Sequence, residues 1–285
     1  MAQATWKDSR KGGGQRLAQR GVPAPNGAIS NARAMERGVQ ASTMVGGLVP
    51  HGEVGMQSSK NICAVVRLRP PVEAELLRGD SARMARGEGA AWLKGVAEPG
   101  GLVDQQTGEV WHFDWVFGPE ATTAQLYEAI VRGIVGSFCE GFNGTILTCG
   151  PTASGKTFTM QGGGQADGII QLAVRDIFAR ISSELDSSYI LSASYLEIFQ
   201  EQIFDLLSED DAGVCVLDNQ QGTPEFRNLT ARRVTAGPED ILFCLEEGNR
   251  RRRGAEGEQG GRPCKSHAVL RIEMESQQAA QGGGR

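Results

Sequence analysis

The chain has 285 residues, of which 40% are hydrophobic, and carries a formal net charge of −5 at pH 7. A chain of this length suits one sizeable folded domain, and the small negative charge argues against the broad basic field that favours nucleic-acid binding. No apolar run reaches the ~20 residues that a membrane-spanning helix needs, so we expect no membrane insertion.

The first sixty residues differ from the rest in composition. They are rich in Gly, Ala, Ser, Gln and Arg and have no sustained hydrophobic period. This composition predicts a disordered, basic, low-complexity extension over residues 1–60. A cleaved transit peptide has a similar composition and remains an alternative. The low complexity of residues 276–285 likewise predicts an unstructured tail, which leaves residues 61–275 as the folded domain.

The folded domain has the pattern of alternating strands and helices. Runs of β-forming residues predict strands over residues 145–149, 189–199 and 268–274. Apolar residues at helical spacing, and a proline suited to a first helical turn, predict helices over residues 125–135, 168–181 and 238–247. Alternation of this kind is typical of an α/β fold built on one sheet.

The most informative segment follows the strand predicted at residues 145–149. Its sequence, Gly-Pro-Thr-Ala-Ser-Gly-Lys-Thr, fits the phosphate-binding pattern G-x-x-x-x-G-K-[ST] at every fixed position. Glycines allow successive backbone N–H groups to turn inward around a phosphate. We therefore expect a nucleotide to be bound by Gly150, Pro151, Thr152, Ala153, Ser154, Gly155, Lys156 and Thr157.

Two side chains of this loop carry the expected chemistry. The Lys156 ammonium would reach the terminal phosphates, and the Thr157 hydroxyl would complete the coordination of Mg²⁺. The predicted cofactors are therefore a nucleoside triphosphate and Mg²⁺.

Further segments, in order along the chain, resemble the kinesin motor domain. They are Cys-Ala-Val-Val-Arg-Leu-Arg-Pro at 63–70, Phe-Asp-Trp-Val-Phe-Gly-Pro at 113–119, Ser-Tyr-Leu-Glu-Ile-Phe at 194–199 and Ser-His at 266–267. The resemblance implies an α/β, P-loop NTPase-type central sheet flanked by helices. It also implies an ATPase that uses ATP and Mg²⁺ to drive movement along microtubules, located in the cytoplasm on the cytoskeleton.

The resemblance adds candidate site residues outside the loop. It implies that Arg67, Arg69 and Pro70 lie on the adenine side of the nucleotide, with Phe158 stacked on the base. It also gives Lys156 and Ser266 catalytic roles beside the γ-phosphate.

One family motif is poorly matched. The family's switch I pattern, N-x-x-S-S-R-S-H, falls on Gly-Gly-Arg-Pro-Cys-Lys-Ser-His at 260–267, where only Ser266 and His267 agree. Lys265 lacks the planar fork of the arginine that it replaces, and the Cys264 thiol is a poor substitute for a hydroxyl near Mg²⁺. Impaired hydrolysis is therefore expected.

The family's switch II pattern, D-x-x-G, does not occur after His267. The resemblance places the switch II strand beside the phosphate-loop strand, so we expect a sheet that is incomplete at the C-terminus and has a central gap. Microtubule binding would then be weak or absent. Two alternatives stay open, namely a non-motile kinesin-like nucleotide-binding protein and an incomplete fragment without activity.

A run of four arginines covers residues 250–253. Such a run could meet the acidic surface of a microtubule, but a solvated helix end is the simpler interpretation. The six cysteines form no C-x-x-C pair and predict reduced structural thiols.

Overall fold

The computed structural model describes most of the chain beyond residue 100 and short segments before it. The described residues are 2–8, 41–47, 62–70, 93–95, 100–105, 107–184, 187–210, 213–218, 224–252 and 266–278. The helices are α4 (Thr123–Leu126), the π-helix η2 (Tyr127–Val131), α5 (Arg132–Cys139), α6 (Lys156–Gln161), α7 (Ile169–Ser183) and α8 (Pro238–Arg251). The strands are β1 (Ala2–Asp8), β2 (Ala41–Gly47), β3 (Ile62–Leu68), β4 (Leu93–Gly95), β5 (Gly101–Asp104), β6 (Val110–His112), β7 (Trp115–Phe117), β8 (Gly144–Cys149), β9 (Ser187–Phe199), β10 (Gln202–Asp205), β11 (Cys215–Asp218), β12 (Pro224–Arg227), β13 (Arg232–Arg233) and β14 (His267–Gln278).

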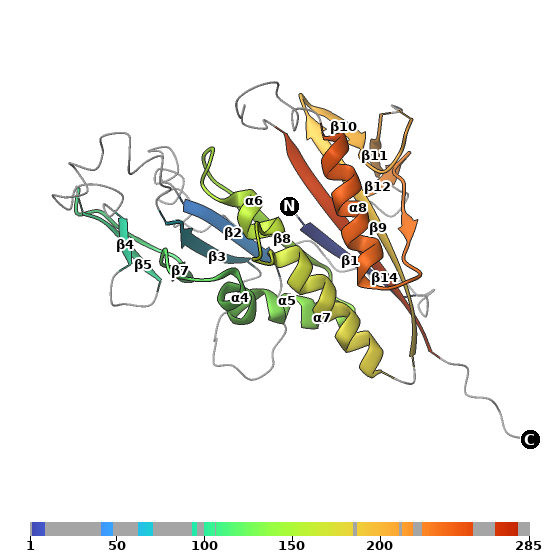
Figure 1. Cartoon of the computed structure of the whole chain (residues 1–285), viewed down its shortest axis with the longest axis horizontal. Coiled ribbons are helices and arrows are strands. Elements are labelled where there is room, and N and C mark those ends of the chain that lie inside the picture. Colours follow the sequence, from blue (N-terminus) through green and yellow to red (C-terminus); the bar gives the residue numbers. More distant parts are fainter. Residues whose placement is uncertain are drawn as a thin grey trace, which may run out of the picture.

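A mixed sheet runs through the described part of the molecule (Figure 1). Its nine described strands follow the order β10-β9-β14-β1-β8-β2-β3-β7, with β13 paired to β9. The antiparallel pair β9 and β14 is the longest, with aligned partners from His267–Ile198 to Gln278–Ser187. Two small sheets, β4-β5-β6 and β11-β12, stand apart from it.

The central position in this sheet belongs to β8, the strand that leads into the phosphate loop. It pairs antiparallel with β1 on one edge and antiparallel with β2 on the other. β1 also pairs in parallel with β14, and β2 pairs antiparallel with β3. Both edges of β8 are therefore covered by strands from the first forty-seven residues.

This arrangement corrects two expectations. The prediction of disorder over residues 1–60 is wrong for Ala2–Asp8 and Ala41–Gly47, which are strands, while the remaining residues before Ile62 lie outside the described part of the chain. The expected central gap beside the phosphate-loop strand is also wrong, because β1 lies between β8 and β14. Composition alone could not predict this, since paired strands take their partners from distant parts of the chain.

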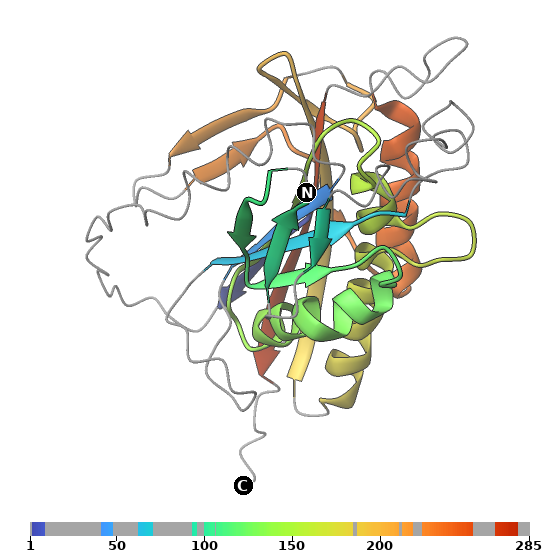
Figure 2. The ribbon, with the colours of Figure 1, turned by 90° about the vertical axis from the view of Figure 1, so that its left-hand side faces the viewer.

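The described helices gather on one side of the sheet (Figure 2). They share one hydrophobic core, which includes Leu126, Phe138, Val174, Ile241 and Met274. The helical periodicity predicted for residues 168–181 is confirmed, because Val174 and Ile177 of α7 are buried. α8 begins with Pro238 at its first turn and ends with basic residues, an arrangement that complements the helix dipole.

The other predicted elements are confirmed with small shifts of their ends. Strands at 145–149, 189–199 and 268–274 correspond to β8, β9 and β14, and helices at 125–135 and 238–247 correspond to α4–α5 and α8. The expectation of an unstructured tail over 276–285 is wrong for residues 276–278, which continue β14, and residues 279–285 lie outside the described part.

In the described segments, no helix combines the length and apolar character that a membrane crossing requires. The five cysteines within these segments are all free thiols.

Candidate functional site

The phosphate loop connects β8 to α6, as predicted. Gly150 has φ +149°, Ala153 has φ +62°, and Gly155 has φ +91° where it caps the N-terminus of α6. These positive φ angles let the backbone curl back on itself within six residues, which is the geometry needed to direct several N–H groups at one anion. Ser154, in the middle of the curl, is 2% exposed and donates its N–H to the Pro151 carbonyl at 3.3 Å.

Lys156 lies over this curl. Its ammonium donates to the carbonyl oxygens of Gly150 at 3.0 Å and Pro151 at 2.7 Å. Among the described residues it forms no ion pair with a carboxylate. A lysine whose charge is balanced only by loop carbonyls fits a phosphate group, because charge-assisted bonds to phosphate are stronger than bonds to neutral carbonyls. Thr157, the expected Mg²⁺ ligand, is exposed beside it.

Arg67, one of the residues expected on the adenine side, makes its hydrogen bonds within the protein. It is 8% exposed, and its guanidinium donates to the Thr123 hydroxyl at 3.0 Å, the Thr159 hydroxyl at 3.0 Å and the Ala121 carbonyl at 3.1 Å. Burial lowers the pKa of Arg67 from its usual value. These contacts join β3 to α4 and α6, so the arginine holds the phosphate-loop helix against the sheet.

The other adenine-side candidates do lie beside the loop. A Cβ atom built on Gly155 would lie 3.9 Å from the Cβ of Arg69, so the segment after β3 lies next to the start of α6. Pro70 is exposed and accepts a hydrogen bond from Arg69 at 2.9 Å through its carbonyl. The Phe158 ring is 43% exposed, with the Arg67 guanidinium 5.5 Å from its centroid. An exposed aromatic face supported by a buried arginine is suited to stacking on a base.

Ser266 is held by two charged side chains. Its hydroxyl donates to Glu197 at 2.5 Å and accepts from Arg252 at 3.1 Å. Glu197 is fully buried, and the Arg252 Nε lies 3.6 Å from its carboxylate. The rest of the expected switch I segment, residues 260–265, lies outside the described residues.

A second polar group, which sequence reasoning missed, lies at the end of the phosphate-loop helix. Gln161, the last residue of α6, and Asn249 of α8 exchange two amide hydrogen bonds of 3.0 and 3.3 Å. The buried Tyr195 donates to the same Asn249 oxygen at 2.8 Å. The one sequence signal for this group was the spacing of Tyr195 and Glu197, two positions apart on the same face of a strand.

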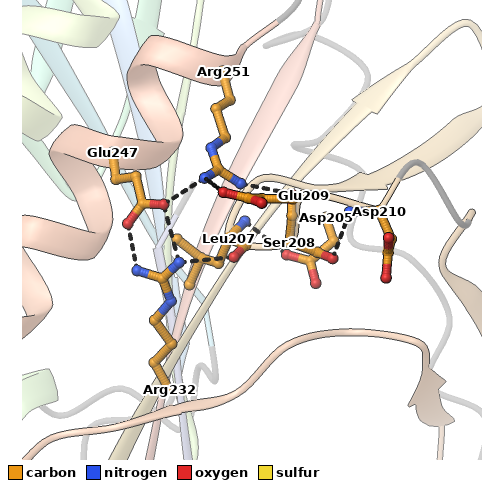
Figure 3. A network of polar contacts seen from close by, with 8 residues as sticks. All are labelled: Asp205, Leu207, Ser208, Glu209, Asp210, Arg232, Glu247 and Arg251. Atoms are coloured by element: carbon orange, nitrogen blue, oxygen red, sulfur yellow. Dashed lines mark hydrogen bonds and ion pairs between the residues drawn. The ribbon is translucent and has the colours of Figure 1, made fainter.

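Two arginines of the run at 250–253 bond to other parts of the fold, and Figure 3 shows the contacts of Arg251. Arg251 binds Glu247 at 2.8 Å and the Ser208 carbonyl at 2.6 Å, and Glu247 also forms a two-bonded ion pair with Arg232. The hydrogen bonds from Arg232 lower the pKa of Glu247 below its usual value. Arg252 contacts Ser266, Arg250 is exposed, and Arg253 lies outside the described residues. Among the described arginines of the run, the interpretation as a solvated helix end therefore holds for Arg250.

Comparison with known proteins agrees with these features. The family model of the kinesin motor domain matches residues 67–284. Kinesin-like protein KIN-7D, mitochondrial, of Arabidopsis thaliana is 33% identical over 220 residues, which cover 76% of this chain and 19% of that protein. Kinesin-like protein KIN-7I of Oryza sativa subsp. japonica is 37% identical over 166 residues, covering 58% of this chain and 14% of that protein. Kinesin-like protein KIN-7N of Arabidopsis thaliana is 31% identical over 217 residues, covering 76% and 25%.

The chain thus spans a quarter or less of the length of these three relatives. The match nevertheless covers most of its own residues and includes the phosphate loop, the buried strand β9 and the strand that follows Ser266. The chain belongs to the kinesin motor domain family.

Proposed function

We propose that this chain binds ATP and Mg²⁺ through the phosphate loop and serves as the nucleotide-binding part of a microtubule motor. The observation that carries the proposal is the curled loop between β8 and α6, with Lys156 over its carbonyl groups. In such a site Lys156 binds the terminal phosphates, and Thr157 contributes a ligand to Mg²⁺. Phe158 and Pro70 flank the adenine, and Arg69 lies beside them.

The chemistry of such a site is positioning and charge stabilisation during transfer of the γ-phosphoryl group to water. Mg²⁺, when bound, neutralises the charge that develops on the phosphate oxygens. Lys156 adds a positive charge to the same oxygens, and Ser266 orients the γ-phosphate side. In the intact motor, this cycle is coupled to movement along microtubules.

The partner of the intact motor is the microtubule, and its place is the cytoplasm, on the cytoskeleton. Nucleic acid and membrane are not part of the proposal.

A non-motile nucleotide-binding protein is the second candidate. The observation that favours it is the engagement of the Ser266 hydroxyl with Glu197 and Arg252, which directs it into the fold. The substituted switch I sequence supports the same candidate. ATP turnover by the full chain, measured with and without microtubules, separates the two, because only a motor is accelerated by the filament.

The test of nucleotide binding is the substitution Lys156→Ala. We expect it to weaken Mg-ATP affinity by about 2–3 kcal/mol, because a charge-assisted contact is lost. The matched control is Arg132→Ala, which removes a positive charge from an exposed pair with Glu128. Equal affinity of wild type and Lys156→Ala by calorimetry contradicts the proposal.

A further inference from the structure

A chain of polar side chains leads from the phosphate-loop helix to Ser266. We call it the β9–α8 polar network, and its members are Gln161, Asn249, Tyr195, Arg252, Glu197 and Ser266. It is made of two hydrogen-bonded groups, one at the end of α6 and one at the start of β14.

Two elements join these groups. On β9, Tyr195 and Glu197 are two residues apart, so their side chains lie on the same face of the strand. On α8, Asn249 and the capping residue Arg252 are three residues apart, so they lie on the same side of the helix. Tyr195 bonds Asn249 while Glu197 pairs with Arg252, so strand and helix are bound together at two successive levels.

Because the network is buried, losing any of its hydrogen bonds is costly. Tyr195 is 1% exposed and Glu197 is fully buried, so each hydrogen bond that is lost leaves a polar group without water. A shift of α6 moves Gln161, and Gln161 can keep its two amide bonds only if α8 follows. A shift of α8 in turn moves Arg252 and its contact with Ser266.

We propose that the β9–α8 polar network positions Ser266 according to the state of the phosphate loop. Its members other than Ser266 are positioning residues, since they act on the bound nucleotide through α6 and Ser266. The inference rests on the proposed function, because it assumes that the loop binds a nucleotide. It predicts that substitutions in the network change nucleotide affinity although none of Tyr195, Asn249 and Arg252 belongs to the phosphate loop.

The first experiment is a double-mutant cycle on the full chain, with Mg-ADP affinity measured by calorimetry. Gln161→Ala and Asn249→Ala should each weaken binding by about 2- to 10-fold, the range of a net hydrogen bond. The double variant should be no weaker than the worse single variant, because both remove the same contact. The exchanged pair, Gln161→Asn with Asn249→Gln, should recover most of the affinity.

A matched control separates coupling from loosening of α8. Glu247→Gln weakens the ion pair that binds α8 to Arg232 of β13 and the pair with Arg251 within α8 itself (Figure 3). Neither pair involves α6. We expect this variant to lower the unfolding midpoint while leaving Mg-ADP affinity within 2-fold. An affinity loss equal to that of Asn249→Ala, at matched loss of stability, overturns the inference.

The second experiment tests the Ser266 end with Glu197→Gln, which keeps an oxygen acceptor for the hydroxyl and removes the charge that pairs with Arg252. We expect the preference for Mg-ATPγS over Mg-ADP to change by more than 2-fold, with Mg-ADP affinity nearly unchanged. A wild-type preference in this variant contradicts the positioning of Ser266. If Lys156→Ala does not change nucleotide affinity, the proposed function is contradicted. If Lys156→Ala weakens binding but the network variants have no effect, only the inference about the network is contradicted.

Discussion

Gly248 of α8 lies directly against the ring of Tyr195 in β9. A Cβ atom built on Gly248 would lie 2.1 Å from Cδ1 and 2.8 Å from Cε1 of that ring, and 3.1 Å from the Cβ of Leu206. The absence of a side chain at this position lets α8 approach the strand closely enough for Asn249 to meet the Tyr195 hydroxyl. The glycine is therefore required by packing, because its φ angle is not among the positive ones.

This contact predicts that Gly248→Ala destabilises the fold by about 1–3 kcal/mol, the usual cost of overpacking a core. The measurement is the free energy of unfolding in urea. The matched control is Gly133→Ala in α5, where an added Cβ meets nothing within 4 Å. There the substitution should stabilise the chain by about 0.5–1 kcal/mol through better helix propensity. Equal effects at the two positions would contradict this, because they would mean that the Tyr195 ring can shift to admit a methyl group without loss of stability.

Phe158 and Phe142 provide a second comparison, since their side chains are 43% and 47% exposed. Phe158→Ala should weaken Mg-ATP affinity by about 1–3 kcal/mol, the magnitude typical of a base stacked on an aromatic ring. Because nearly half of this residue is exposed, the unfolding free energy should change less than it would for a buried phenylalanine. Phe142→Ala, at the opposite end of β8 from the phosphate loop, should leave affinity unchanged. A large loss of stability with unchanged affinity for Phe158→Ala would identify the ring as a core residue instead.

The ion pair between Glu247 and Arg232 predicts a dependence of stability on pH. The pKa of Glu247 is lowered in the folded chain, mainly by its hydrogen bonds to Arg232, so the folded state holds the carboxylate ionised. Its contribution is present above the unfolded pKa of about 4.3 and is lost as the pH falls through the folded pKa. Glu247→Gln should therefore cost about 1–3 kcal/mol at pH 7 and progressively less below pH ~4. Urea unfolding of both proteins between pH 7 and pH 3 checks this, and a constant difference would contradict it.

The pairing of β2 with β8 can be tested with a single new cysteine. The register aligns Thr43 with Cys149 and Met44 with Thr148. Directly opposed residues in an antiparallel pair lie close enough for a disulfide, while their neighbours along the strand face the other side. Thr43→Cys should form a disulfide with Cys149 under mild oxidation, detected by peptide mass spectrometry, and Met44→Cys should not. Equal cross-linking of both variants would disprove the register.

Structural features were predictable from the sequence where residues close together in the chain determine them. The phosphate loop was predictable because its glycines, lysine and threonine act within eight consecutive residues, and the backbone angles at Gly150 and Gly155 agree with that reading. The helical period of α7 and the start of α8 at Pro238 were predictable for the same reason.

Features that depend on distant partners were not predictable. Arg67 belongs to a motif that suggests nucleotide contact, yet its guanidinium bonds Thr123 and Thr159, more than fifty residues away along the chain. The amide pair of Gln161 and Asn249 is likewise formed across 88 positions, and no local pattern relates the two. The strands β1 and β2 have few large apolar residues, so their composition resembles that of a disordered segment.

The position of β1 between β8 and β14 has a consequence for how the molecule reaches its folded state. The register aligns Ala2 with Leu270 and also with Ile146. β1 therefore pairs with two strands that are synthesised more than a hundred residues after it. Closing such long loops is slow, and a sheet dominated by distant pairings folds later than one built from neighbours. During synthesis β8 can take its first partners as soon as residue 149 is free of the ribosome, whereas β14 can join them only after residue 276. In that interval the free edge of β1 is open to other strands, so the newly made chain should depend on chaperones more than its size suggests.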